Sequence, residues 1–366
     1  MEVPYRRKRE GITPLVDIQK EAHKIAFYPL LFQAVRCLVS LGFFREMEAN
    51  DPEGVTEESL GATSGLSAYA KGLLLEVAEA LELVENRGGR YHLTRLGSFL
   101  ATDASVQINM NFSHHLCYQG AFALEGALLH GRPEGLKHFG DWPTLYEGLT
   151  QLPEQAQKSW FDFDNHYSDI LFDKAVQILL RERPQKVFDL GGNTGKFDVA
   201  LLQADPTVTV TLLDLPQQLE TARKTLRNAG LDHRAHFHPV DVLTEKTLPE
   251  GADVIWMSQF LDCFSGEQIV SILSKVREAA SPRTKIFILE PFVDVQHDGT
   301  RLALLAISLY FTCMANGNSR FYKKTDMENF ITRAGLAINQ EHANFGPYNY
   351  TLLECSLPEN IQFQGL

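Results

Sequence analysis

The sequence predicts an α/β protein with two unlike halves: a mostly helical N-terminal region and a C-terminal parallel sheet covered by helices. After Pro184, short apolar runs of strand length alternate with helix-length segments as far as residue 289, which is the pattern of βαβ units. Before Pro184, apolar residues recur at helical spacing, and residues 56–94 follow the order helix, turn, helix, hairpin. That order predicts a winged helix.

Composition narrows the class of protein. The 366 residues carry a net charge of -12, which argues against nucleic acid or an anionic membrane as partner. The basic run Arg6–Arg9 is expected to be a solvated N-terminal segment. The five cysteines are odd in number, far apart and without metal-ligand spacing, so we expect reduced thiols in a cytoplasmic protein and no metal site. No signal peptide is recognisable, and the apolar stretch 302–314 falls short of the ~20 residues that span a bilayer.

Residues 1–103 are predicted to form the winged-helix domain. A helix is expected from Thr13 to Leu41, Thr56 and Ser67 are candidate caps for two further helices, and Gly88-Gly89 is expected to turn a hairpin. The helix after Ser67 carries two glutamates and one lysine, whereas a helix that reads DNA should be basic or polar. A packing or dimerisation role is therefore favoured.

Residues 104–180 are predicted to be a helical, aromatic-rich linker that lines a substrate site. Residues 181–366 are predicted to form a Rossmann-like domain. Its five expected strands are Lys186–Leu190, Val208–Leu213, Ala235–Val240, Val254–Met257 and Lys285–Leu289.

The first of these strands leads into a glycine-rich turn. Asp189 is followed by Gly191, Gly192 and Gly195, and glycine lets a backbone approach a ligand closely. The spacing differs from the dinucleotide fingerprint Gly-x-Gly-x-x-Gly, and the Lys-Ser/Thr ending of a P-loop is missing. A ligand without a pyrophosphate is favoured.

Two acids end the next two strands. Asp214, followed by Leu215, lies 19 residues beyond Gly195, close to the spacing of an acid that accepts from both ribose hydroxyls; capping of the following helix is the alternative. Asp241 can accept from an adenine amine, and Val242 can cover the ring. Three such features at successive strand ends define one crevice.

On these motifs, residues 186–295 resemble the class I S-adenosylmethionine methyltransferases. The whole chain resembles the O-methyltransferases related to caffeic-acid and hydroxyneurosporene methyltransferases, in which a winged-helix domain mediates dimerisation. The resemblance implies S-adenosylmethionine as cofactor, S-adenosylhomocysteine as product, no metal, a homodimer and a small aromatic substrate.

The chain departs from that family in the catalytic segment. The family has Leu-His-Asp-Trp-Ser-Asp-Glu, with histidine as general base, where this chain has residues 261–267, Leu-Asp-Cys-Phe-Ser-Gly-Glu. Asp262 thus stands at the histidine position. Ser258 replaces a lysine often found near the cofactor carboxylate, and Glu290 matches the acid that orients the histidine.

Three roles stay open for Asp262: a base with a raised pKa, a group that orients an acidic substrate hydroxyl, or a cap of the following helix. Arg320 is a candidate partner for an anionic substrate group, against the alternative of a surface arginine.

The sequence therefore predicts S-adenosylmethionine-dependent methyl transfer to a hydroxylated aromatic or polyketide-like molecule, with O-methylation favoured. The alternatives are C-methylation of an activated ring or dicarbonyl carbon, and a non-catalytic S-adenosylmethionine-binding regulator with a winged helix. A nicotinamide-dependent oxidoreductase is disfavoured by the glycine spacing.

Overall fold

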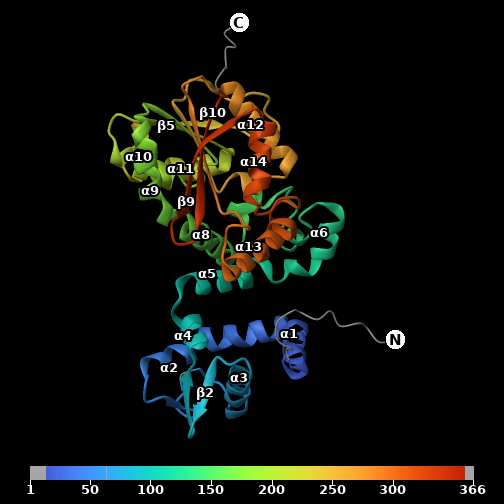
Figure 1. Cartoon of the computed structure of the whole chain (residues 1–366). Helices are drawn as coiled ribbons and strands as arrows, with labels where there is room; N and C mark the ends of the chain where they lie inside the picture. The colour runs from blue at the N-terminus through green and yellow to red at the C-terminus, as the bar shows by residue number, and fades with distance from the viewer. Residues whose placement is uncertain (1–13, 63, 359–366) are drawn as a thin grey trace. The chain divides into compact units, whose positions relative to one another are not determined.

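A computed structural model describes residues 14–62 and 64–358 of the chain. They belong to two compact units, residues 1–110 and residues 111–366, which Figure 1 colours from blue to red along the chain. The basic run Arg6–Arg9 lies outside the described residues.

The N-terminal unit has the predicted winged-helix order. A three-stranded antiparallel sheet with strand order β1-β3-β2 lies among its helices. The elements are α1 (Leu15–Ser40), α2 (Phe43–Ala49), β1 (Val55–Thr56), α3 (Ala68–Ala80), β2 (Val84–Arg87), β3 (Arg90–Leu93) and α4 (Arg95–Thr102), and α5 (Ala104–Phe112) crosses the boundary between the units.

Two of the predicted local signals are confirmed and one is wrong. Ser67 caps α3 by accepting from the Ala70 amide, and Gly88 and Gly89 turn the hairpin with φ of 61° and 84°. Thr56 does not begin a helix. It ends the short strand β1, whose pairing with β3 takes up this segment, and turns follow it.

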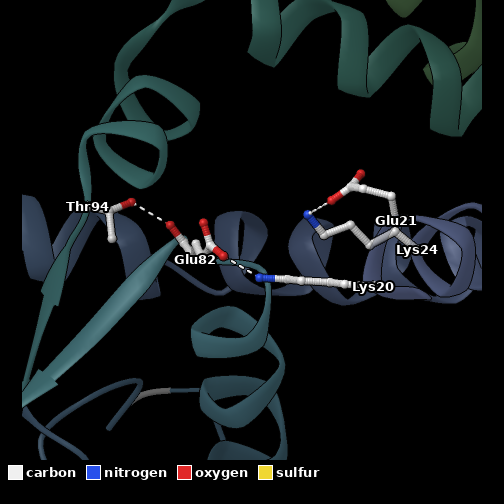
Figure 2. Close-up of polar contacts among 5 residues, drawn as sticks. All are labelled: Lys20, Glu21, Lys24, Glu82 and Thr94. Atoms are coloured by element: carbon white, nitrogen blue, oxygen red, sulfur yellow. Dashed lines mark hydrogen bonds and ion pairs between the residues drawn. The ribbon is translucent and has the colours of Figure 1, made fainter. Parts of the chain in front are cut away.

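The start of α4 is fixed by a polar junction (Figure 2). The Thr94 hydroxyl donates to the Glu82 carbonyl at 2.7 Å and accepts from the Gly97 amide at 3.1 Å, so it caps α4 and ties that helix to the turn before β2. Lys20 of α1 forms an ion pair with the carboxylate of Glu82. The same turn therefore connects three elements of the unit.

Helix α1 leaves many apolar side chains exposed. Leu15 and Ile25, two members of its apolar stripe, are 63% and 65% exposed, whereas the buried members of the helix are Val35 and Leu38. Among the described residues no single helix is long and apolar enough to cross a membrane; only α1 and α2 taken together, with a 53° bend between them, meet the length and composition test.

The C-terminal unit contains the predicted parallel sheet, with strand order β6-β5-β4-β7-β8-β10-β9. β4 to β8 pair in parallel, and β10 pairs antiparallel with both β8 and β9. The strands are β4 (Lys186–Leu190), β5 (Thr209–Asp214), β6 (Ala235–Pro239), β7 (Val254–Ser258), β8 (Lys285–Glu290), β9 (Ala337–Phe345) and β10 (Tyr350–Ser356). The five expected strands are present, and β9 and β10 extend the sheet beyond them.

Helices cover both faces of this sheet (Figure 1). One core packs the sheet against α9 (Phe172–Leu179), α10 (Lys196–Ala204) and α11 (Pro216–Asn228). The other packs it against α12 (Gly266–Ala279) and α14 (Lys324–Arg333). This Rossmann-like arrangement brings the loops after β4, β5, β7 and β8 to one edge.

A third core belongs to the aromatic-rich helical region, in which Phe112, Leu116 and Trp160 pack against Tyr310 and Phe311. Its helices are α6 (Leu124–His130), α7 (Leu145–Gly148), α8 (Glu154–Ser168) and α13 (Asp298–Tyr310), with π-helical turns at Ser113–Cys117 and Phe311–Ala315. Five further aromatic side chains of this region are partly buried and pack against the core: Phe139, Trp142, Tyr146, Phe161 and Phe163.

Two glycines of the N-terminal unit allow a matched stability test. A Cβ on Gly97 would lie 2.0 Å from the Leu83 carbonyl oxygen, whereas a Cβ on Gly72, inside α3, would meet only Glu57 Oε1 at 3.5 Å. We expect Gly97→Ala to lower the free energy of unfolding by about 1–3 kcal/mol. Gly72→Ala should leave it unchanged or raise it by up to about 1 kcal/mol. Chemical denaturation measures both, and equal stabilities would contradict the packing at α4.

Candidate active site

The loop after β4 depends on glycine. Gly191 and Gly195 have φ of 77° and 72°, in the left-handed region. A Cβ on Gly191 would also lie 2.2 Å from the Phe260 ring. The Gly191 amide donates to the Leu213 carbonyl at 3.0 Å, which fixes the loop against the end of β5. A larger residue would push the loop away from the neighbouring segment.

Asp214 joins this loop to the end of β5. Its Oδ2 accepts from the Asn193 amide at 2.9 Å, and its Oδ1 accepts from the Leu215 amide at 2.7 Å. Burial raises the pKa of Asp214 to about 6 against the opposing effect of these two bonds. Leu215 is the N-cap of α11, and no side chain caps that helix, so Asp214 does not play the capping role.

The third predicted position lies after β6. Asp241 is exposed, and its carboxylate accepts from the Leu243 amide at 2.9 Å and from the Thr244 hydroxyl at 3.0 Å. Val242 is buried in the core beneath it. Both residues lie at the predicted edge, while their contact with an adenine stays a prediction.

A pocket with about 500 Å³ of empty space, partly open to solvent, lies at the ends of β4 and β7. It brings together four of the predicted residues: Asp189, Gly191, Gly192 and Ser258. Its other lining residues are Asp164, Ser168, Phe172, Asn193, Thr194, Lys196, Phe197, Trp256 and Gln259.

Asp189 at the end of β4 and Asp198 of α10 are two buried carboxyl groups that influence each other's pKa. Asp189 is 3% exposed and Asp198 is fully buried. Burial raises the pKa of both carboxyl groups, and the charge of Asp189 raises that of Asp198 further. The two groups therefore titrate as a pair, and ionisation of one makes ionisation of the other more costly.

Asp262 lies in the 3₁₀ turn η8 (Leu261–Cys263) and is 5% exposed. Burial raises its pKa above the usual 3.8, with further repulsion from Asp164. The Tyr146 hydroxyl donates to Cys263 Sγ at 3.0 Å, and Cys263 Sγ lies 3.5 Å from Asp262 Oδ1. The helix that follows is capped by Ser265 in a capping box with Gln268, so the interpretation of Asp262 as that cap is wrong.

Glu290 supports the segment that carries Asp262. It is 1% exposed at the end of β8, and its Oε1 accepts from the Phe260 amide at 3.1 Å and from the Leu261 amide at 2.9 Å. Burial first, and the charge of Asp262 second, raise the pKa of Glu290 well above 4.5. Two carboxyl groups thus lie close together in a buried setting.

Arg320 is exposed and donates through Nε to the Phe321 carbonyl, which favours the surface interpretation. Among the described residues, no group of three or more histidine, cysteine, aspartate or glutamate side chains could hold a metal ion.

Comparison with known proteins decides the family. Residues 123–337 match the O-methyltransferase domain, and residues 19–91 match the Dimerisation2-like domain. The chain belongs to the O-methyltransferase domain family. It is a methyltransferase, and the predicted fold class and resemblance are confirmed.

Relatives of this methyltransferase include the L-tyrosine C(3)-methyltransferase of Streptomyces lavendulae, 27% identical over 85% of each chain. The demethylspheroidene O-methyltransferase of Cereibacter sphaeroides is 27% identical over 79% of this chain and 73% of its own length. Among solved structures, the S-adenosylmethionine-dependent methyltransferase SibL has a TM-score of 0.70 and 25% identity, and the match covers 92% of this chain and 99% of SibL.

Several polar residues of the pocket wall were not predicted from the sequence, among them Asp164, Asn193 and Lys196. Asp164 on α8 accepts from Asn193 Nδ2 at 2.9 Å, and Lys196 at the start of α10 pairs with Asp169 at 2.7 Å. Asn193 and Lys196 are next to glycines of the motif in the sequence, so their position in the pocket wall could have been expected. Asp164 lies 25 residues before the motif's first residue, on a helix whose neighbours the sequence does not reveal.

Substitution of Glu290 tests its supporting role. Glu290→Leu leaves the Phe260 and Leu261 amides without their acceptor, which should cost about 1–3 kcal/mol of unfolding free energy. Glu290→Gln keeps an acceptor oxygen and should cost less. Because the folded state raises the pKa of Glu290, the folded protein binds that proton more tightly than the unfolded chain does. The wild-type unfolding free energy should therefore fall as pH rises above 4.5.

Denaturation at about pH 5 and about pH 8 measures this linkage. The stability of Glu290→Gln relative to wild type should improve at the higher pH. The matched control is Glu267→Gln, whose side chain is 81% exposed. An equal pH response of wild type and Glu290→Gln would contradict the assignment.

Proposed function

We propose that this methyltransferase methylates a small hydroxylated aromatic or polyketide-like molecule, with Asp262 as the group that accepts the acceptor's proton. The observation that carries the proposal is a buried carboxylate with a raised pKa at the end of β7, beside the cofactor-type loop. The cofactor S-adenosylmethionine supplies an activated methyl group when bound.

The residues present suit an adenosine-containing cofactor. Gly191 and Gly192 line the pocket, and the small size of glycine lets a ligand approach the backbone of the loop there. Asp214 has two oxygens, each of which holds one backbone amide and has lone-pair capacity left for a ribose hydroxyl. Asp241 and Val242 at the next strand end are proposed to contact the adenine.

The environment of Asp262 suits a base. A free carboxylate with a pKa near 4 is poorly matched to a phenol with a pKa near ~10, but burial narrows that gap. Tyr146 and Cys263 also surround Asp262, and burial raises the pKa of both well above their usual values. They therefore stay protonated, and Asp262 is the group here that can take a proton at neutral pH.

The favoured acceptor atom is a phenolic oxygen. A ring carbon ortho to a phenol is the second candidate, because a relative that matches 85% of this chain is named for methylation at C(3) of tyrosine. Both reactions begin with loss of the phenolic proton, so both are compatible with Asp262. The two products are isomers of equal mass, and the proton and carbon NMR shifts of the new methyl group separate an ether methyl from a ring methyl.

Two variants separate cofactor binding from chemistry. Asp214→Ala should abolish micromolar binding of S-adenosylmethionine and S-adenosylhomocysteine in calorimetry, since it removes the ribose acid. Asp262→Asn should leave that binding intact and lower turnover of a phenolic acceptor by roughly 10²–10⁴-fold. It should also remove the rise of turnover with pH, because the wild-type base must ionise.

Absence of binding by the wild-type protein would end the cofactor assignment. Unchanged turnover in Asp262→Asn would remove this residue from the mechanism while leaving the cofactor site in place.

We also propose that the protein is a homodimer. The match to the Dimerisation2-like domain and the exposed apolar stripe of α1 support this. Light scattering should give twice the chain mass of 41.2 kDa, and Ile25→Glu, which places a charge in the stripe, should shift the protein towards the monomer. A wild-type monomer at micromolar concentration would contradict the proposal.

A further inference from the structure

A chain of two side-chain hydrogen bonds ends on the carboxylate of Asp262. The Tyr146 hydroxyl on α7 donates to Cys263 Sγ at 3.0 Å, and the Cys263 thiol donates to Asp262 Oδ1 at 3.5 Å. A thiol has a single proton to donate. Because Tyr146 donates to the sulfur, the thiol proton is directed at Asp262.

The protonation of Tyr146 and Cys263 fixes the direction of this chain. Burial raises the pKa of both groups well above their usual values, and the charge of Asp262 adds to the effect at Cys263. Both therefore keep their protons at neutral pH and act as donors. The thiol hydrogen bond favours the ionised form of Asp262, whereas burial opposes it. An aspartate at position 263, as in the family's segment, would instead repel that charge.

The backbone around Cys263 is held independently of its thiol. Asn316 Nδ2 donates to the Cys263 carbonyl at 2.7 Å. The Tyr322 hydroxyl donates to the Phe264 carbonyl at 2.7 Å, and Glu290 holds two backbone amides at the start of the turn. Loss of the thiol should therefore leave the turn in place, so that its effect on the neighbouring carboxylate can be measured.

We propose that Tyr146 and Cys263 are positioning residues for methyl transfer: the hydroxyl orients the thiol, and the thiol holds Asp262 Oδ1, which assigns Oδ2 to the proton of the acceptor. This inference rests on the proposed function, in which Asp262 is the base. Neither Tyr146 nor Cys263 exchanges a proton with the substrate. Both act through the orientation and the charge of Asp262.

The pH profile of methyl transfer tests the role of the thiol. Single-turnover rates with S-adenosylmethionine and a phenolic acceptor, measured against pH, give the apparent pKa of the base. Cys263→Ala removes a donor to the ionised form and should raise that pKa by about half a pH unit to one pH unit. Cys263→Ser keeps a donor and should return the pKa towards the wild-type value. An unshifted profile in Cys263→Ala, or the same shift in both variants, would overturn the inference.

Tyr146→Phe tests the first hydrogen bond of the chain. This change keeps the aromatic ring and removes the hydroxyl that orients the thiol, so the apparent pKa of the base should rise by less than in Cys263→Ala. In the Cys263→Ala background the same change should add no further shift, since both variants act through one thiol. Shifts that add in the double variant would contradict the chain.

Other ionisable groups face Asp262 and Cys263 and can influence the same profile. They are Asp164 of α8, Glu290 of β8, Tyr310 of α13, Tyr322 ahead of α14 and Tyr350 of β10. Burial raises the pKa of Glu290 and of the three tyrosines, so these groups keep their protons at neutral pH. Asp164, with a pKa raised to about 7, titrates in the same range as the base. The shift caused by Cys263→Ala should persist in the Asp164→Asn background, and its loss there would reject the assignment.

Infrared spectroscopy tests the hydrogen bond without turnover. Subtraction of the Cys263→Ala spectrum from that of wild type isolates the S–H stretching band of Cys263. The band should shift as Asp262 ionises, because a carboxylate is a stronger acceptor than a carboxylic acid, and Asp262→Asn should remove this pH dependence. The matched control is the exposed Cys37, whose band should keep its position over the same range. A Cys263 band that does not move with pH would sink the proposal.

Turnover of Asp262→Asn separates this inference from the proposed function. Unchanged turnover in Asp262→Asn would reject both. A large loss of turnover in Asp262→Asn, together with an unshifted pH profile in Cys263→Ala, would reject the positioning role alone and leave Asp262 as the base.

Discussion

The site depends on carboxyl groups that end the parallel strands and accept hydrogen bonds from the backbone of neighbouring loops. Asp214 holds the Asn193 amide, and Glu290 holds those of Phe260 and Leu261. The backbone of a sharp loop has amides that no strand or helix satisfies, and a short acid at a strand end is a fixed acceptor for them. The positions of the glycine loop and of Asp262 follow from these bonds.

Several ionisable carboxyl groups are therefore buried close together at the ends of the strands. Burial is the leading cause of the raised pKa at each of Asp164, Asp189, Asp214, Asp262 and Glu290. These carboxyl groups do not all ionise readily, because each negative charge raises the free-energy cost of ionising the next group. An anionic ligand would add to that cost, so an acid-rich pocket disfavours one. The same reasoning disfavours a pyrophosphate, in agreement with the glycine spacing.

The sequence predicted the parts of this architecture that are local. The alternating strands and helices, the glycine turn and Asp214 could be predicted because each is encoded in a short segment. The period of apolar residues in such a segment indicates a strand or a helix, and the spacing of its glycines and acids indicates the turn and the strand end. Two failures have a tertiary cause. Thr56 lies in a strand and not at a helix start, because its segment pairs with β3. Asp164 was not predicted, because the contact of α8 with the pocket depends on tertiary packing that no local sequence pattern encodes. The cap that had been an option for Asp262 is made by Ser265, three residues later.

The neighbours of the two exceptional acids separate their roles. Asp164 lines a pocket that is partly open to solvent, and its carboxylate accepts from the Asn193 side-chain amide. Asp262 is enclosed by Tyr146, Cys263 and Glu290, and burial raises the pKa of each of these well above its usual value. Glu290 already holds the Phe260 and Leu261 amides through Oε1, and burial first and the charge of Asp262 second raise its pKa. Asp262 therefore lies among groups that hold their own protons more tightly than usual. Because these neighbouring groups keep their own protons, Asp262 is the side chain among them that can accept the proton of the substrate. This supports the proposal that aspartate can replace histidine at this position.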